Sequence, residues 1–267
     1  MNNVAERILD EPFTNAAIVG REYGVCRSTV RKVWNDIGIF SHIAARKPRL
    51  TEAQREERLG YALQNLTRDW STVIFSDEKT FQSDGLQRKR VYRPKNTRFD
   101  KEYVLPVQRS GRICAGVWGW IGLHGPGELS MISGRLNSVG YVELLQENLT
   151  PTINICYGGL KNIVFMQDNC SIHTSRVTQR WFAAHPGLVL INAPVNSPDL
   201  NPIENLWAEL MRDWKDVYPR NKERLKQYIF ERWEAKRYDL QYFQNLYASM
   251  PNRMKAVIDA NGGPTKY

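Results

Sequence analysis

Two short apolar runs that each end in an aspartate constrain the possible fold of this chain more than any other feature of its sequence. The first run is Ile74-Phe75-Ser76-Asp77, and the second is the stretch 163–167, which Asp168 follows. Buried central strands have no use for a carboxylate, whereas open α/β sheets place their ligands at the carboxyl ends of strands. If the two strands are neighbours, the two carboxylates lie side by side and repel each other unless a cation lies between them. Carboxylate oxygens suit Mg²⁺ or Mn²⁺. Taken singly, each aspartate could instead simply begin a turn.

Glu204 is the third candidate acid, and its local pattern supports two interpretations equally. In Asn201-Pro202-Ile203-Glu204, an Asn at the N-cap, a Pro at the first helical position and a Glu at the third predict a capping box. The helix that begins here carries an apolar stripe, and Glu204 lies at the edge of that stripe, where it could face a site. The stripe consists of Ile203, Trp207, Leu210 and Trp214.

Strands and helices alternate through most of the chain, which predicts an α/β layered domain. Apolar runs predict strands over 73–75, 113–121, 129–132, 163–166 and 188–191, and helices over 139–149 and 176–184. Helices are predicted over 51–65, where Thr51 and Gln54 form a possible capping box, and from Pro202 nearly to Met250, with a break near Pro219. We expect the tail from Asn261 to be loose.

The N-terminal region has the pattern of a helix-turn-helix. Helices are predicted over 15–23 and 27–37, with Gly24 at the turn and with Val30, Val33, Trp34 and Ile37 as the buried face of the second helix. The residues left toward a DNA groove are Arg27, Ser28, Thr29, Arg31 and Lys32. The alternative interpretation is a small helical hairpin with a solvated basic face.

Charge and cysteine content narrow the class of protein. The chain carries 37 Lys and Arg against 28 Asp and Glu, a net charge of +9 that indicates a polyanionic partner. Its four cysteines form no C-x-x-C pair, which favours a reducing compartment over a disulfide framework or a zinc site. The acidic N-terminus is unlike a signal peptide, and the longest uncharged apolar stretch, 113–123, is too short to span a bilayer. Secreted and membrane-bound classes are therefore excluded.

Three segments of the sequence resemble the signature blocks of the Tc/mariner-superfamily DDE transposases, in their Tc-like branch. They are Ser76-Asp77-Glu78-Lys79-Thr80-Phe81, Gln167-Asp168-Asn169 with His173-Thr174-Ser175, and Ser197-Pro198-Asp199-Leu200-Asn201-Pro202-Ile203-Glu204-Asn205-Leu206-Trp207. The resemblance runs from about residue 13 to residue 217. It implies a ribonuclease-H-like catalytic domain, a mixed sheet flanked by helices, behind a small all-α helix-turn-helix domain.

The same resemblance implies what the chain does. Asp77, Asp168 and Glu204 would bind two Mg²⁺ ions, for which Mn²⁺ could substitute, about 3.5–4 Å apart. The activity would be cut-and-paste DNA transposition in the nucleus: hydrolysis at the terminal inverted repeats, then attack of the freed 3′-hydroxyl on target DNA at a TA dinucleotide. Two ends must be joined in one event, so a homo-oligomer on paired ends is expected. Asn169 and His173 would support the site without binding metal.

The sequence departs from the family pattern in two respects. Asp168 and Glu204 are separated by one residue more than is usual in the Tc branch. The N-terminal region resembles only the second half of the family's paired-like DNA-binding region, and Cys26 stands where the family usually has a capping Ser or Thr. These departures put end-specific binding in doubt. A catalytically inactive, transposon-derived DNA-binding protein and a structure-specific nuclease remain alternatives.

Two clusters of basic residues, one before Asp77 and one between Asp77 and Asp168, could contact DNA. The stretch 87–112 holds nine basic residues against two acidic ones and could follow DNA phosphates or form a solvated strand face. Its first basic residues are Arg88, Lys89 and Arg90. Arg46, Lys47 and Arg49 could add a phosphate contact or part of a nuclear import signal. The expected domains are 1–40 (helix-turn-helix), 41–70 (basic linker and helix), 71–218 (catalytic) and 219–267 (C-terminal helical extension).

Overall fold

The computed structural model describes residues 2–41, 49–83, 113–157, 162–215 and 220–267. The chain forms two compact units, Met1–Lys47 and Pro48–Tyr267. Several predictions fall outside the described residues: Arg46, Lys47, the basic stretch 87–112 with Arg88, Lys89 and Arg90, and the helix break near Pro219. The expected domain bounds 1–40, 41–70, 71–218 and 219–267 stay predictions.

The first unit consists of three helices around a small core. Helix α2 (Ala16–Glu22) begins at Asn15, whose side chain accepts from the Ala17 amide, and a turn at Gly24 (φ +65°) leads into α3 (Arg27–Asp36). Helix α1 (Asn2–Asp10), which was not predicted, completes the core. It is held by the Trp34 indole, whose Nε1 donates to the Val4 carbonyl at 2.9 Å.

Val30 and Trp34 are buried as predicted, but the prediction that Ile37 is buried is wrong. Helix α3 ends at Asp36, so Ile37 is the residue after its last turn and is 47% exposed. The chain then turns at Gly38 (φ +77°), and Ile39 packs against the core in its place.

A five-stranded mixed sheet organises the second unit and confirms the predicted α/β class. Its order is β3-β2-β1-β4-β5, with β1 antiparallel to β2 and parallel to β4. Strands β3 and β5 complete the sheet, antiparallel to β2 and parallel to β4 respectively. The strands are β1 (Val73–Gln82), β2 (Cys114–Gly122), β3 (Gly125–Ile132), β4 (Ile163–Gln167) and β5 (Leu188–Asn192).

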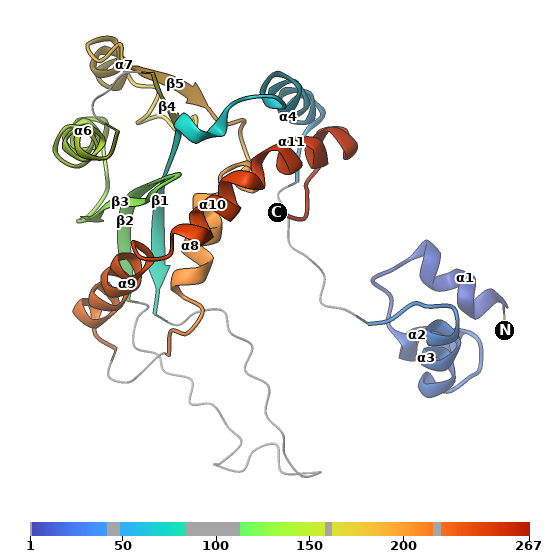
Figure 1. Cartoon of the computed structure of the whole chain (residues 1–267). Helices are drawn as coiled ribbons and strands as arrows, with labels where there is room; N and C mark the ends of the chain where they lie inside the picture. Colours follow the sequence, from blue (N-terminus) through green and yellow to red (C-terminus); the bar gives the residue numbers. More distant parts are fainter. Residues whose placement is uncertain (1, 42–48, 84–112, 158–161, 216–219) are drawn as a thin grey trace. The chain divides into compact units, whose positions relative to one another are not determined.

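Helices cover both faces of the sheet (Figure 1). One face packs against α5 (Ser138–Leu144), a π-helical turn (Leu145–Leu149), α6 (Thr150–Tyr157) and α7 (Arg176–Ala183). The other packs against α4 (Glu52–Asn65), α8 (Ile203–Leu210), α9 (Lys222–Lys236), α10 (Leu240–Ala248) and α11 (Met250–Asp259). The capping box predicted at Thr51 and Gln54 starts α4. Among the described residues, no helix is long and apolar enough to cross a membrane.

Strand β1 is longer than predicted. The apolar run ends at Asp77, but β1 continues to Gln82 because β2 pairs with it as far as Gln82. On its other edge, β1 pairs with β4 only over Val73–Phe75. Asp77 therefore lies inside a strand, yet just beyond the end of the parallel β1–β4 pairing. Asp168 directly follows β4, as predicted.

The C-terminal predictions need three corrections. The predicted capping box at Glu204 is not formed: Pro202 is the N-cap of α8, no side chain caps that helix, and the Glu204 carboxylate is used elsewhere. Trp214 lies beyond the end of α8 and packs against Tyr228, because the helix stops at Leu210. The tail is not loose: Gly262 and Gly263 are buried and accept from Arg58 of α4, and Thr265 is buried against Asp199.

Candidate active site

Asp77 points from β1 toward α8. Its Oδ2 accepts a hydrogen bond of 2.9 Å from Nε1 of Trp207, a buried residue of α8. The Trp207 ring stacks on Trp233 with 5.1 Å between ring centroids. On β2, opposite Asp77, a Cβ at Gly119 would lie 2.9 Å from the Trp233 ring and 3.0 Å from the Trp207 ring, so glycine leaves room for the two stacked indoles. Trp207 therefore fixes the orientation of the Asp77 carboxylate.

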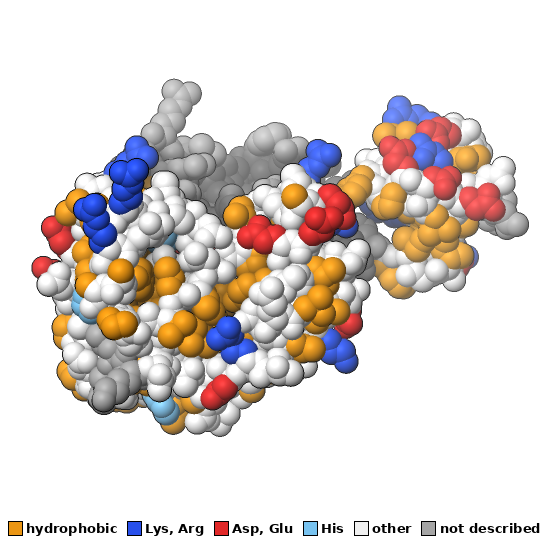
Figure 2. Space-filling view, turned by 90° about the horizontal axis from the view of Figure 1, so that it is seen from above, with side chains coloured by type: hydrophobic (Ala, Val, Ile, Leu, Met, Phe, Trp, Pro, Cys, Tyr) orange, Lys and Arg blue, Asp and Glu red, His pale blue; other side chains and the backbone are white. Residues whose placement is uncertain are grey.

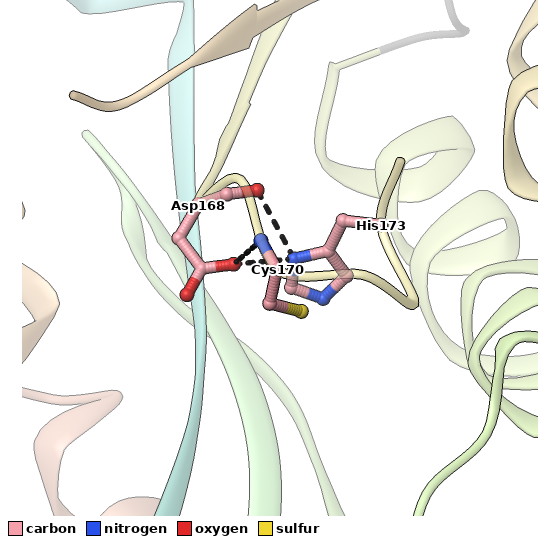
Figure 3. Close-up of side chains that lie close together, drawn as sticks. All are labelled: Asp168, Cys170 and His173. Atoms are coloured by element: carbon pink, nitrogen blue, oxygen red, sulfur yellow. Dashed lines mark hydrogen bonds and ion pairs between the residues drawn. The ribbon is translucent and has the colours of Figure 1, made fainter. Parts of the chain in front are cut away.

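Asp168 occupies the loop after β4, where its own turn and a histidine hold it (Figure 3). Oδ1 of Asp168 accepts from the Cys170 amide at 2.9 Å and lies 2.7 Å from Nδ1 of His173. The Asp168 side chain is 58% exposed, whereas that of His173 is 3% exposed. The histidine thus supports the carboxylate from the protein interior and leaves one side of it open.

The same histidine contacts a second acid, Glu78, for which the sequence pattern predicts no role. Nε2 of His173 lies 3.1 Å from Oε1 of Glu78, and the Tyr141 ring packs over the imidazole at 4.3 Å between ring centroids. Burial lowers the pKa of His173, but hydrogen bonds and charge interactions with Asp168 and Glu78 outweigh burial and raise it to about 9. At neutral pH, an imidazolium therefore bridges two carboxylates.

Glu204 projects from the first turn of α8. Its Oε2 forms an ion pair with Nζ of Lys79, with 2.6 Å between the two atoms. Lys79 lies two residues after Asp77 and hence on the same face of β1. Both side chains are about one-third exposed, at 35% and 31%. The turn before α8 is tied to the sheet, because Nδ2 of Asn201 donates to the Ser76 carbonyl at 3.1 Å.

One pocket brings the three predicted acids together. It has a volume of about 380 Å³ and is lined by Asp77, Asp168 and Glu204, which come from β1, the loop after β4 and α8. Asn169 also lines it, and Nδ2 of Asn169 donates to the Ala193 carbonyl at 3.2 Å. Most of the remaining wall is the loop 193–198. His173 is not in the wall, so its geometry fits support of Asp168 rather than contact with a ligand.

The pKa values of the two aspartates are shifted in opposite directions from their usual range. Burial, followed by the charges of Glu204 and Glu78, raises the pKa of Asp77 to about 7. The hydrogen bond from His173 holds the pKa of Asp168 below its usual range. The rise at Asp77 reflects negative charges gathered in a place that water reaches poorly. All donor atoms of this set are carboxylate oxygens, which is the donor chemistry that hard divalent cations prefer.

The predicted DNA contacts are mostly exposed where they are described. Arg27, Ser28, Arg31 and Lys32 lie on the exposed surface of α3. Thr29 is half-buried, and its Oγ1 lies 3.0 Å from Sγ of Cys26 at the N-cap. Arg49 is exposed in the second unit. Among the described atoms on the face seen in Figure 2, basic and acidic side chains of the second unit are interspersed rather than arranged as one track.

Sequence reasoning missed the residues that hold the acids in place. Glu78 and Lys79 were visible in the first signature block, but their roles depend on β1 continuing past Asp77. Strand alternation from Asp77 onward would have placed Lys79 on the face of Asp77 and Glu78 on the opposite face. The Trp207 indole was expected in the core, where it lies, but no sequence pattern indicates its hydrogen bond to Asp77.

Comparisons with known proteins agree with this architecture. Residues 72–226 match the family described as DDE superfamily endonuclease. The chain is 34% identical to the Tcb1 transposase of Caenorhabditis briggsae and 32% identical to the Tc1 transposase of Caenorhabditis elegans; each match covers 90% of this chain and 88% of the relative. The Mos1 mariner paired-end complex with Mn superposes with a TM-score of 0.83 at 17% identity, over 98% of this chain and 79% of that chain. The fold is that of a ribonuclease-H-like catalytic domain.

Proposed function

Because this chain belongs to the Tc1-like transposases of the DDE superfamily, we propose that Asp77, Asp168 and Glu204 form its cleavage site. The chain is a cut-and-paste transposase, which acts as an endonuclease and as a DNA strand transferase. The observation that carries the assignment is that three elements far apart in the sequence deliver one carboxylate each to a single pocket.

The carboxylates fit Mg²⁺ or Mn²⁺, and the pocket would hold two such ions. When bound, the ions would activate a water or a 3′-hydroxyl and stabilise the oxygen that leaves the phosphodiester. Mos1 paired-end complexes with Mn and with Mg are consistent with the same requirement here. Crowding of negative charge at Asp77 also favours a cation in this pocket, because a cation would relieve the repulsion.

The chain's own side chains prepare the site for that charge. His173 keeps Asp168 ionised, and Trp207 fixes the rotamer of Asp77. Lys79 neutralises Glu204 as long as no other cation is near. The open side of Asp168 faces the pocket, where a DNA phosphate could approach.

We assign end recognition to the N-terminal unit. A helix-turn-helix places the early residues of its second helix against base edges in the major groove. The second helix here is α3, whose exposed residues include Arg27, Ser28, Arg31 and Lys32. The DNA partners would be the terminal inverted repeats and TA target sites, and the site of action would be the nucleus. Mos1 forms a paired-end complex with its transposon end, and we propose a homo-oligomer on paired ends for this chain as well.

Arg31→Ala should weaken binding to a labelled duplex from the end of the element. Because Arg31 also carries a positive charge into the groove, its loss should reduce the slope of log affinity against log salt by about 1. We expect metal-dependent nicking of the same duplex to persist at saturating protein, because Arg31 lies outside the catalytic unit. Binding measured by fluorescence anisotropy at several salt concentrations gives the slope.

Lys226→Ala is the matched control, because Lys226 is a basic residue on α9 in the other unit. It should leave binding unchanged. Equal binding by wild type and Arg31→Ala would remove α3 from the DNA-reading surface. A wild-type protein that bound the duplex but did not nick it with Mg²⁺ or Mn²⁺ would contradict the proposed cleavage site.

A further inference from the structure

A buried ionic network surrounds Asp199, five residues before Glu204 and outside the cleavage pocket. Both Asp199 carboxylate oxygens accept from the Arg58 guanidinium, at 2.8 Å each, and one also accepts from Oγ1 of Thr265 at 2.8 Å. The side chains of Arg58 and Asp199 are 1% and 6% exposed. Neither is used in the cleavage chemistry described above.

The network joins three segments that are distant in the sequence. Arg58 comes from α4, Asp199 from the 3₁₀ turn before α8 (Pro198–Leu200), and the rest from the C-terminal segment. Arg58 also donates to the Gly262 carbonyl at 2.9 Å. Gly262 has φ +75°, and a Cβ there would lie 2.1 Å from the Arg55 carbonyl oxygen, so only glycine allows this close approach.

A second arginine spans the residues on both sides of Glu204. Nη1 of Arg253, on α11, donates to the Asp199 carbonyl at 2.8 Å, and Nη2 donates to Oδ1 of Asn205 at 2.7 Å. Arg253 itself is 2% exposed. One planar guanidinium thus fixes the distance between the 3₁₀ turn and the residue that directly follows Glu204.

The first turn of α8 needs this external support. The N-cap residue Pro202 offers no side-chain cap, and the neighbouring Asn201 accepts from the Ile203 amide only at a long 3.4 Å, so local contacts hold the start of the helix weakly. The Glu204 side chain has a flexible, partly exposed partner in Lys79, which cannot set the position of the backbone. Buried ion pairs contribute little net stability compared with apolar packing, and their best-attested use is to specify one arrangement. An arrangement that fixes the start of α8 fixes Glu204.

We propose that Arg58 and Arg253 are positioning residues for Glu204: through Asp199 and Asn205 they hold the start of α8 in the register in which Glu204 reaches the metal pocket. This inference rests on the proposed metal-binding role of Glu204. It assigns a function in catalysis to α4 and to the C-terminal segment, neither of which contributes a side chain to the pocket.

The test measures metal binding and cleavage separately in full-length protein. Asn205→Ala is the gentle variant, because it removes one contact of Arg253 at an exposed residue; Arg253→Lys removes the bridge but keeps the charge. Loss of a partner that orients a metal ligand typically lowers metal affinity about 10–100-fold. We expect the midpoint of Mn²⁺ binding, measured by isothermal titration calorimetry, to increase about tenfold in both variants. The Mg²⁺ midpoint of nicking should increase in parallel, and excess Mn²⁺ should restore the rate.

Lys255→Met, an exposed substitution on the same helix, is the control and should leave both midpoints unchanged. Unchanged metal midpoints in Asn205→Ala and Arg253→Lys would overturn the inference, even if melting temperatures fell, because that pattern indicates structural support alone. Mn²⁺ binding by wild type without nicking would contradict the proposed function and leave the inference standing. No Mn²⁺ binding by wild type would overturn both.

Discussion

Asp168→Asn and Asp77→Asn should each abolish strand cleavage while leaving the affinity for an end duplex unchanged. An amide keeps the size and part of the hydrogen bonding of each side chain, but it removes the charge that would hold a divalent ion. Charge stabilisation by a bound metal is worth several kcal/mol in such reactions, so a loss of about 10³-fold or more is expected. Denaturing gels report the cleaved strand, and anisotropy reports binding.

Asp259→Asn is the matched control, an aspartate at the end of α11 that does not line the pocket. It should cleave at the wild-type rate. Wild-type cleavage in Mg²⁺ by either Asp77→Asn or Asp168→Asn would show that the carboxylates in the pocket are not the metal ligands. Loss of DNA binding in either variant would contradict the separation between the reader and the cleavage site.

The same two substitutions should change stability in opposite directions in metal-free protein at pH 8. The pKa of Asp77 is raised to about 7, whereas in the unfolded chain it titrates near its model value of 3.8. Its ionisation therefore costs folding free energy, a cost that grows as pH rises from about 4 to about 7 and is constant above that. Asp77→Asn removes this cost, and we expect the free energy of unfolding to increase by about 2 kcal/mol at pH 8 and by less at pH 5.

The charge of Asp168 contributes to the free energy of unfolding with the opposite sign from that of Asp77. Its pKa is lowered by the hydrogen bond from His173, so its charge contributes stability that is present above the unfolded pKa and is lost as pH falls through the folded pKa. Because the carboxylate is half-exposed and screened, Asp168→Asn should cost only about 0.5 kcal/mol at pH 8. Urea unfolding in EDTA, followed by tryptophan fluorescence, measures both. Destabilisation by Asp77→Asn at pH 8 would show that burial and the neighbouring acids do not disfavour the charge of this carboxylate.

Local sequence patterns predicted most of the elements that carry the acids. The apolar runs predicted the strands that lead to Asp77 and Asp168, and the structure shows that these strands are parallel neighbours. The stripe of Ile203, Trp207 and Leu210 predicted the helix of Glu204. These predictions succeed because strand and helix periodicity depends on residues that are close in sequence. The prediction that the apolar stripe of α8 extends to Trp214 is wrong, because the helix ends at Leu210. The end of a helix depends on tertiary contacts as well as on local periodicity.

The supporting contacts could not be predicted because they join distant parts of the chain. Arg58 and Asp199 are 141 residues apart, and Lys79 and Glu204 are 125 residues apart. Neither pair leaves a periodic signal. The tail after Asn261 looked loose because its glycines and short polar residues are typical of termini. In the structure, Gly262 and Thr265 are ordered by the partners that Arg58 and Asp199 supply.

The most direct test of the cleavage site is strand cleavage of a labelled end duplex by wild type and Glu204→Gln, in Mg²⁺, in Mn²⁺ and in EDTA. Gln keeps the length of the side chain and can still accept from Lys79, so only the charge of the carboxylate is lost. We expect metal-dependent nicking by wild type, no nicking in EDTA, and binding without nicking by Glu204→Gln. Wild-type nicking by Glu204→Gln, or nicking that persists in EDTA, would contradict a metal site built on Asp77, Asp168 and Glu204.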